Sequence, residues 1–230
     1  DESMLGCLEL TAHAQAQCLS LVRAVAKGHS AVLLSGIAAD TAALFAGALW
    51  RLGNHVAGRP SPGEPGSSNI DALSDDLDPT KWKKAPAVVT SLGCYLRYMY
   101  AMCSALSMAA YSQDLVKVER KGGVASKIAG EALALHARAE KLGAQYDEAQ
   151  AAAEAPPGPK KRGGLFGSGG GGAAPCAARS LFHDAVGTHV STVASTVIRD
   201  NERIYYGNVP GALPDVTRAP PRRVLEPLAA

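Results

Sequence analysis

Aromatic residues and net charge are both scarce in this chain of 230 residues. Phe, Trp and Tyr make up 5% of it, and 23 basic side chains almost balance 21 acidic ones, leaving a formal charge of +2. A net charge this small creates no global field that would attract nucleic acid. We therefore expect no nucleic-acid partner. Few aromatics beside many alanines and leucines favour packed helices over a β-sandwich.

Cysteines in disulfide or metal-binding spacing are also lacking. The chain has five cysteines, an odd number, and no Cys-x-x-Cys pair. Most of them lie in apolar stretches, which is typical of buried, reduced thiols in a cytosolic protein. We therefore expect a cytoplasmic location. The five are Cys7, Cys18, Cys94, Cys103 and Cys176.

Long apolar runs are missing too. No uninterrupted apolar stretch reaches the roughly 18 residues that a membrane-spanning helix needs, and the chain does not begin with a basic, apolar leader. We expect no secretory signal and no transmembrane segment. Because helical periodicity begins almost at the first residue, we also expect an N-terminal part of the domain to be missing.

Signatures of catalysis and of metal binding do not occur. The sequence has no Gly-x-x-x-x-Gly-Lys-Ser/Thr loop, no Gly-x-Ser-x-Gly elbow and no cysteine in a recognisable nucleophile context. His183 and His189 lie six residues apart, a spacing that turns them away from a common metal position on a helix. We expect no catalytic residue, metal or cofactor. An enzyme is the alternative if catalytic residues lie outside this sequence.

What the sequence does contain is helical periodicity. Apolar residues recur three or four positions apart in five stretches, which predicts an all-α fold in a single domain over residues 1–230. Glycines between the stretches, including Gly122-Gly123, indicate that successive helices fold back on one another. The predicted helices cover residues 4–27, 30–52, 81–120, 124–153 and 176–203.

Two stretches lack this periodicity. Residues 58–79 combine four prolines with glycines, serines and an acidic run, which predicts a flexible loop. Residues 155–175 are rich in glycine and proline and predict a disordered insertion. The basic run Lys160-Lys161-Arg162 in the insertion is too short for stable anchoring to anionic lipid, so a solubilising linker is favoured.

Two short motifs are more specific. Residues 199–210 read Arg-Asp-Asn-Glu-Arg-Ile-Tyr-Tyr-Gly-Asn-Val-Pro, a helix end with two tyrosines, a capping glycine and a terminating proline. This run resembles the end of the Bro-one domain, the family of Alix, rhophilin and Brox. Residues 14–17, Ala-Gln-Ala-Gln, resemble a second run of that family. The residues that carry the C-terminal match are Asp200, Asn201, Ile204, Tyr205, Val209 and Pro210.

The resemblance implies a fold and a partner. It spans the C-terminal two-thirds of a Bro-one domain and implies a curved helical solenoid with tetratricopeptide-like antiparallel helix pairs. It further implies a non-catalytic scaffold, peripheral on endosomes through its partners, that binds the C-terminal amphipathic helix of an ESCRT-III filament subunit. By gap-free alignment the binding positions are Leu33, Ile37 and Ser20, where Ser20 replaces an aromatic residue.

Each of these assignments has an alternative. An interpretation of Leu33 and Ile37 as ordinary core residues is equally consistent with the sequence. Tyr205 matches a family tyrosine that resembles a phosphotyrosine docking site, but a tyrosine at a helix end is often a packed ring. The alternative function is a structural helical module of a larger Rho-effector-like signalling protein. An exposed apolar patch on the first two helices would favour the scaffold, and a covered one would favour the module.

Overall fold

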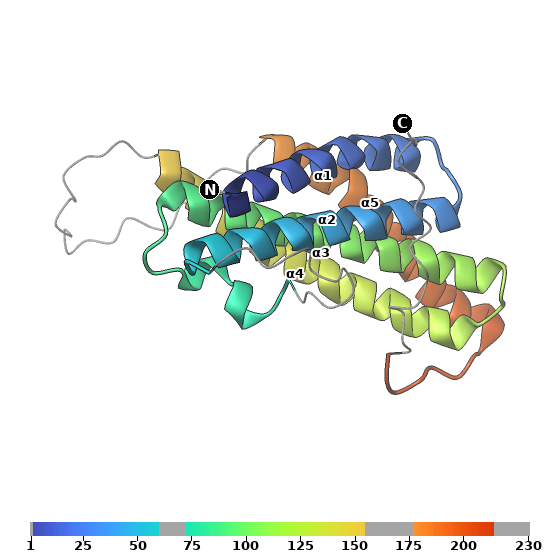
Figure 1. Cartoon of the computed structure of the whole chain (residues 1–230). Coiled ribbons are helices and arrows are strands. Elements are labelled where there is room, and N and C mark those ends of the chain that lie inside the picture. The colour runs from blue at the N-terminus through green and yellow to red at the C-terminus, as the bar shows by residue number, and fades with distance from the viewer. Residues whose placement is uncertain (1, 60–71, 155–176, 214–230) are drawn as a thin grey trace, which may run out of the picture.

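The computed structural model describes residues 2–59, 72–154 and 177–213, and these ranges form helices without any strand (Figure 1). The all-α prediction is confirmed. Five long helices lie side by side, with α1 and α2 along one flank and α3 between α2 and α4. The helices are α1 (Glu2–Ala26), α2 (Ala31–Val56), α3 (Ala87–Lys117), α4 (Gly122–Glu154) and α5 (Ala177–Asp200).

Local sequence explains where α2 and α3 begin. The Ser30 side chain caps α2 by accepting a hydrogen bond from the Leu33 N–H at 3.4 Å. We predicted that the third helix begins at residue 81, but α3 begins only after Pro86. The reason is that proline disfavours helical geometry in the residue before it. Residues 79–81 form instead a separate 3-10 helix, η2 (Pro79–Lys81).

Part of the predicted flexible loop is packed against the helices. Residues 72–79 of the range 58–79 include a 3-10 helix, η1 (Asp75–Leu77), and the buried residues Ala72 and Pro79. Residues 60–71 and the predicted insertion at 155–175 lie outside the described residues. The described end of the loop therefore contributes to the core.

Helix α3 occupies the centre of the protein. The four consecutive residues from Leu96 to Met99 are all buried, so a complete turn of this helix is covered on every side. Its neighbours are α2, α4 and α5, and one continuous apolar cluster draws side chains from all five long helices. Four of the seventeen buried residues of α3 are alanines, which let the neighbouring backbones approach closely.

Close approach also fixes the register of α1 against α2. A side chain added at Gly47 would meet Leu10 Cδ1 at 3.3 Å, so the glycine makes room for the leucine. Farther along, the Thr41 hydroxyl donates a hydrogen bond to Gln17 Oε1 at 2.9 Å. As the positions rise from Leu10 to Gln17 on α1, their partners descend from Gly47 to Thr41 on α2. The two helices therefore form an antiparallel hairpin.

Helix α2 also passes a simple test for a membrane span. It is 26 residues long with a mean hydropathy of 1.8 over its most apolar window, and 56% of that window is buried inside the protein. Core helices pass the same test, and α2 supplies Phe45, Leu49 and Leu52 to the core. The expected absence of a transmembrane segment stays a prediction.

A buried ion pair fastens the 3-10 segment to α3. Arg97 Nη1 lies 2.9 Å from Asp78 Oδ1, and Arg97 Nη2 donates to the carbonyl oxygens of Leu73 at 2.8 Å and Ser74 at 3.1 Å. Burial alone would raise the pKa of Asp78. Hydrogen bonds from the Thr80 hydroxyl and N–H, and the charge and hydrogen bond of Arg97, outweigh burial and hold that pKa below its usual value.

This pair predicts a specific loss of stability in acid. Because the pKa of Asp78 is lower in the folded protein, ionised Asp78 stabilises the fold above its unfolded pKa of about 4, and the contribution disappears as the pH falls through the folded pKa. Urea unfolding at a series of pH values should show Asp78→Asn less stable than the wild type at pH 7. The two should converge below about pH 4.

The matched control is Asp76→Asn, because Asp76 is exposed two residues earlier, in η1. The free energy of unfolding of Asp76→Asn should match that of the wild type over the whole pH range. A difference between wild type and Asp78→Asn that persists unchanged at pH 2 would show that the carboxylate charge is not what stabilises this segment.

Candidate functional site

The three positions implied by the family resemblance lie on the α1–α2 hairpin. Leu33 and Ile37 are half-buried on α2, and Ser20 is exposed on α1. Leu33 and Ile37 are four residues apart and therefore share one face of the helix, on which the half-buried Leu44 also lies. Ile37 and Leu44 pack partly against the core. The structure thus forms one apolar strip on α2.

The hairpin register places Ser20 beside this strip. Gln17 bonds to Thr41, and nearer the turn Ala24 and Leu34 pack in one small cluster. Between these two contacts, Ser20 falls at the height of residues 37 and 38 on the opposite helix. Ser20, Leu33 and Ile37 lie along the same outer edge of this helix pair. We call this edge the α1–α2 seam.

Exposed apolar side chains also lie on both helices outside the α1–α2 seam. Leu19, which precedes Ser20, is 76% exposed, and Val32, which precedes Leu33, is 41% exposed. Leu5 and Leu8 extend the exposed apolar surface toward the start of α1. An apolar surface that reaches solvent on two adjacent helices marks a candidate contact surface for another protein.

The C-terminal motif is organised around one buried amide. The Asn201 side chain donates from Nδ2 to the Gly207 carbonyl at 3.1 Å and accepts at Oδ1 from the Gly207 N–H at 3.0 Å. This pair of bonds closes the short π-helical turn Asn201–Tyr205, which ends at Tyr206 with a left-handed φ of 47°. The asparagine of the family motif therefore has a structural role here.

The same turn explains the glycine pair predicted to separate two helices. A side chain at Gly122 would meet the Asn201 amide oxygen, and one at Gly123 would collide with the carbonyl group of Asn208. Residues 122 and 123 begin α4, with the backbone of the C-terminal motif lying directly against them. The glycine pair and the C-terminal motif, about 80 residues apart in the sequence, therefore contact each other.

This contact predicts opposite effects for two substitutions in α4. Gly123→Ala should lower the free energy of unfolding by more than about 2 kcal/mol, because its Cβ would press on backbone that cannot rotate away. Gly130→Ala should raise it by about 0.5–1 kcal/mol, since Gly130 is exposed on the same helix with no atom within 4 Å of the added carbon. Urea titrations of both variants measure the difference. Equal effects would contradict the contact.

Tyr205 is only partly covered. It is 39% exposed, with its Cβ beside Gly122, whereas Tyr206 is 77% exposed. Asp200 is half-buried, and Ile204 and Val209 of the same motif are exposed. Pro210 is half-buried where the chain leaves the turn. Tyr205 is therefore accessible on one side, and its docking role stays a prediction.

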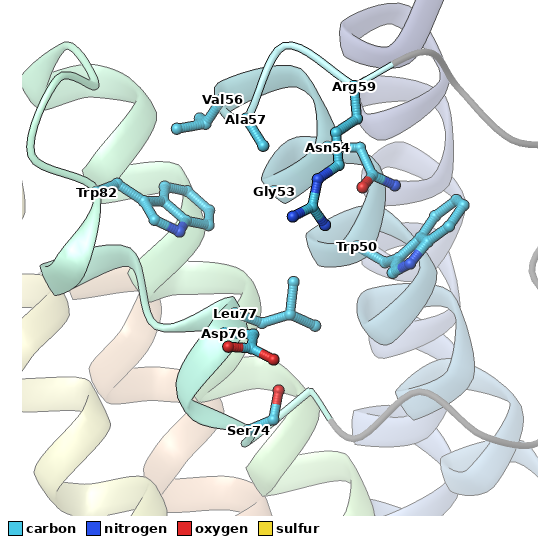
Figure 2. A pocket seen from close by; sticks show the side chains of 10 residues that line it. All are labelled: Trp50, Gly53, Asn54, Val56, Ala57, Arg59, Ser74, Asp76, Leu77 and Trp82. Carbon is cyan, nitrogen blue, oxygen red and sulfur yellow. The ribbon is translucent and has the colours of Figure 1, made fainter.

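A cavity of about 660 Å³ lies at the end of α2 (Figure 2). Trp50 and Trp82 stand on opposite sides of it, and Arg59 points into the space between them. Asp76 of η1 closes the side facing α3. Arg59 is the last described residue before the range 60–71, so these residues are the described part of its wall.

The cysteines of the described ranges are buried thiols. The four within the described ranges, Cys7, Cys18, Cys94 and Cys103, are buried and free, as the sequence predicted. Burial raises the pKa of the Cys7 and Cys94 thiols to about 11, so neither is a thiolate nucleophile at neutral pH. Cys176 lies outside the described residues.

The histidines are arranged differently from the sequence expectation. His183 was weighed against His189, but the pairing of α4 with α5 places it beside His136 and Glu140. The signal available in the sequence was the four-residue spacing of His136 and Glu140, which puts both on one face of α4. The contribution of α5 depends on helix pairing, which local spacing does not reveal.

Comparisons with known proteins assign no functional site to this chain. No family model matches the chain, and no curated protein matches it. The resemblance to the Bro-one domain rests on residues 14–17 and 199–210 and the positions between them. What this resemblance implies about function is a proposal.

Proposed function

We propose that this protein is a non-catalytic scaffold of the Bro-one type that binds the C-terminal amphipathic helix of an ESCRT-III filament subunit at the α1–α2 seam. The observation that supports it best is the apolar strip formed by the half-buried side chains of Leu33 and Ile37, with the exposed Ser20 at the same height on α1. An amphipathic helix docks by placing side chains at four-residue spacing into such a strip. The proposal follows the sequence resemblance and the surface together.

The expected binding is weak. A single short helix in a shallow seam has an affinity in the micromolar range, and a Kd of 1 μM corresponds to about 8 kcal/mol. On a filament many copies of the helix stand side by side, so several scaffold molecules linked together would gain avidity. In this proposal the helix pairs continue into a curved solenoid, and the protein is cytoplasmic and reaches endosomal membranes through its partners.

The packing of Ile37 supports one competing function. Ile37 and Leu44 contact the core, as they would in a helical module that only spaces other domains of a Rho-effector-like protein. Such a module would leave the seam without a ligand. The two functions differ in whether the seam binds a helix, which a direct binding measurement decides.

Removing the apolar anchors should weaken binding. The double variant Leu33→Asp, Ile37→Asp places two carboxylates where the ligand would cover two aliphatic side chains. Burial of one such side chain contributes about 1.5–3 kcal/mol, and burial of an unpaired carboxylate is unfavourable. Fluorescence anisotropy with a labelled C-terminal helix peptide of an ESCRT-III subunit should show micromolar binding to the wild type. The Kd of the double variant should be at least tenfold higher, with its helical circular dichroism unchanged.

The matched control changes two exposed valines at the ends of α3, away from the seam. Val88 and Val118 are 67% and 71% exposed, so Val88→Asp, Val118→Asp adds the same charge without touching the strip. Its Kd should stay within twofold of the wild type. A folded wild-type chain that binds no peptide up to about 1 mM would overturn the scaffold and leave the spacing module.

A gain in affinity offers an independent test. Ser20 is exposed beside the strip, at the position where the family has an aromatic residue. Ser20→Phe should tighten peptide binding by about tenfold, because a ring there would add apolar area to the seam. Ser195→Phe on the exposed face of α5 is the control and should leave the Kd unchanged. If Ser20→Phe has no effect while the wild type binds, the peptide occupies another surface.

A further inference from the structure

Three side chains with metal-binding chemistry converge between α4 and α5. His136 and Glu140 lie one turn apart on α4, and His183 faces them from α5. A ring nitrogen of each histidine and a carboxylate oxygen of Glu140 all lie within 4.8 Å of one another. The imidazole rings stack with centroids 5.3 Å apart and planes inclined by 22°. We propose that His136, Glu140 and His183 bind one Zn²⁺ ion that cross-links α4 to α5.

The environment of His136 supports this site independently of the clustering. Its Nε2 atom is buried and has no hydrogen-bond partner among the described residues. Most buried polar atoms have a partner, so an unpaired one indicates a missing ligand or water. Gly187 on α5 makes room for the imidazole itself, because an added side chain there would lie 2.6 Å from His136 Nε2.

His183 is oriented so that its outer nitrogen faces the cluster. Its Nδ1 lies 3.4 Å from the hydroxyl of Tyr98, which is fully buried on α3, and its Nε2 lies 3.8 Å from Glu140 Oε1. When Nδ1 carries the proton it donates to the tyrosine oxygen, and the lone pair of Nε2 points toward Glu140. Metal-binding histidines are usually oriented in this way, by a hydrogen bond from the ring nitrogen that does not bind the metal.

Two imidazoles and one carboxylate select a borderline transition metal. Zn²⁺ binds such nitrogen and oxygen atoms at about 2.0–2.2 Å, whereas Mg²⁺ and Ca²⁺ prefer oxygen alone. The ligand atoms would need to close by about 1.5 Å to reach tetrahedral spacing. Rotation of the Glu140 side chain, which is 58% exposed, provides much of this movement.

Burial and the neighbouring His183 lower the pKa of His136, although Glu140 opposes the shift. Three protein ligands leave the fourth position of a tetrahedral ion to water.

Zinc titration of the whole chain tests the site. The probe is Zn²⁺ itself, added to chelator-treated protein in a buffer with a non-metal-binding reductant and followed by isothermal titration calorimetry. One equivalent should bind the wild type. His183→Ala and Glu140→Gln should each weaken that binding at least tenfold, and the thermal midpoint of the wild type should rise with added Zn²⁺.

The control is His29→Ala, since His29 is exposed at the turn between α1 and α2. Its affinity for Zn²⁺ should stay within twofold of the wild type. Co²⁺ in place of Zn²⁺ should give visible bands of a tetrahedral ion without the near-ultraviolet absorption of a cobalt–thiolate bond.

Three outcomes would overturn the proposal: no stoichiometric binding tighter than about 0.1 mM, equal weakening by His29→Ala, or thiolate absorption that assigns the metal to cysteines. Glu140→Gln keeps the test decisive if His183→Ala unfolds, because Glu140 is on the surface and its amide has nearly the same shape. These outcomes are separate from peptide binding at the α1–α2 seam.

Discussion

The structure depends on the burial of α3 around its whole circumference. A helix with a consecutive buried turn, such as Leu96 to Met99, needs neighbours on every side, and α2, α4 and α5 supply them. Once three helices surround α3, their outward faces are left to meet only one another or solvent. The two proposed sites therefore lie between peripheral helices and not at the centre of the protein.

The two peripheral seams differ in chemistry for this reason. The α1–α2 seam lies where α1 packs on α2 beyond the central helix, and its outer edge is apolar, with Leu33 and Ile37 half-buried. The seam between α4 and α5 has Tyr98 of α3 as its floor and carries His136, Glu140 and His183. An apolar edge is suited to another amphipathic helix, whereas nitrogen and oxygen ligands over a buried hydroxyl are suited to an ion.

The helices themselves could be predicted from sequence because apolar spacing is a local property. The starts of α2 and α4 were anticipated by Ser30 and by Gly122-Gly123. The start of α3 was placed six residues too early, at residue 81, because Pro86 was expected to be tolerated near the start of the helix. The packing of residues 72–79 was missed because it comes from Arg97, a distant side chain whose bonds to Leu73 and Ser74 leave no local pattern.

The same distinction between local and tertiary information applies to the sites. Leu33 and Ile37 could be selected from sequence because both belong to one helix face and to a family resemblance. His183 could not be paired with His136, since 46 intervening positions and the register of α4 against α5 decide their distance. The buried, unpaired nitrogen of His136 is a property of the folded protein alone. For this chain, the proposed partner surface could be selected from sequence, whereas the proposed ion site follows only from the packing of α4 against α5.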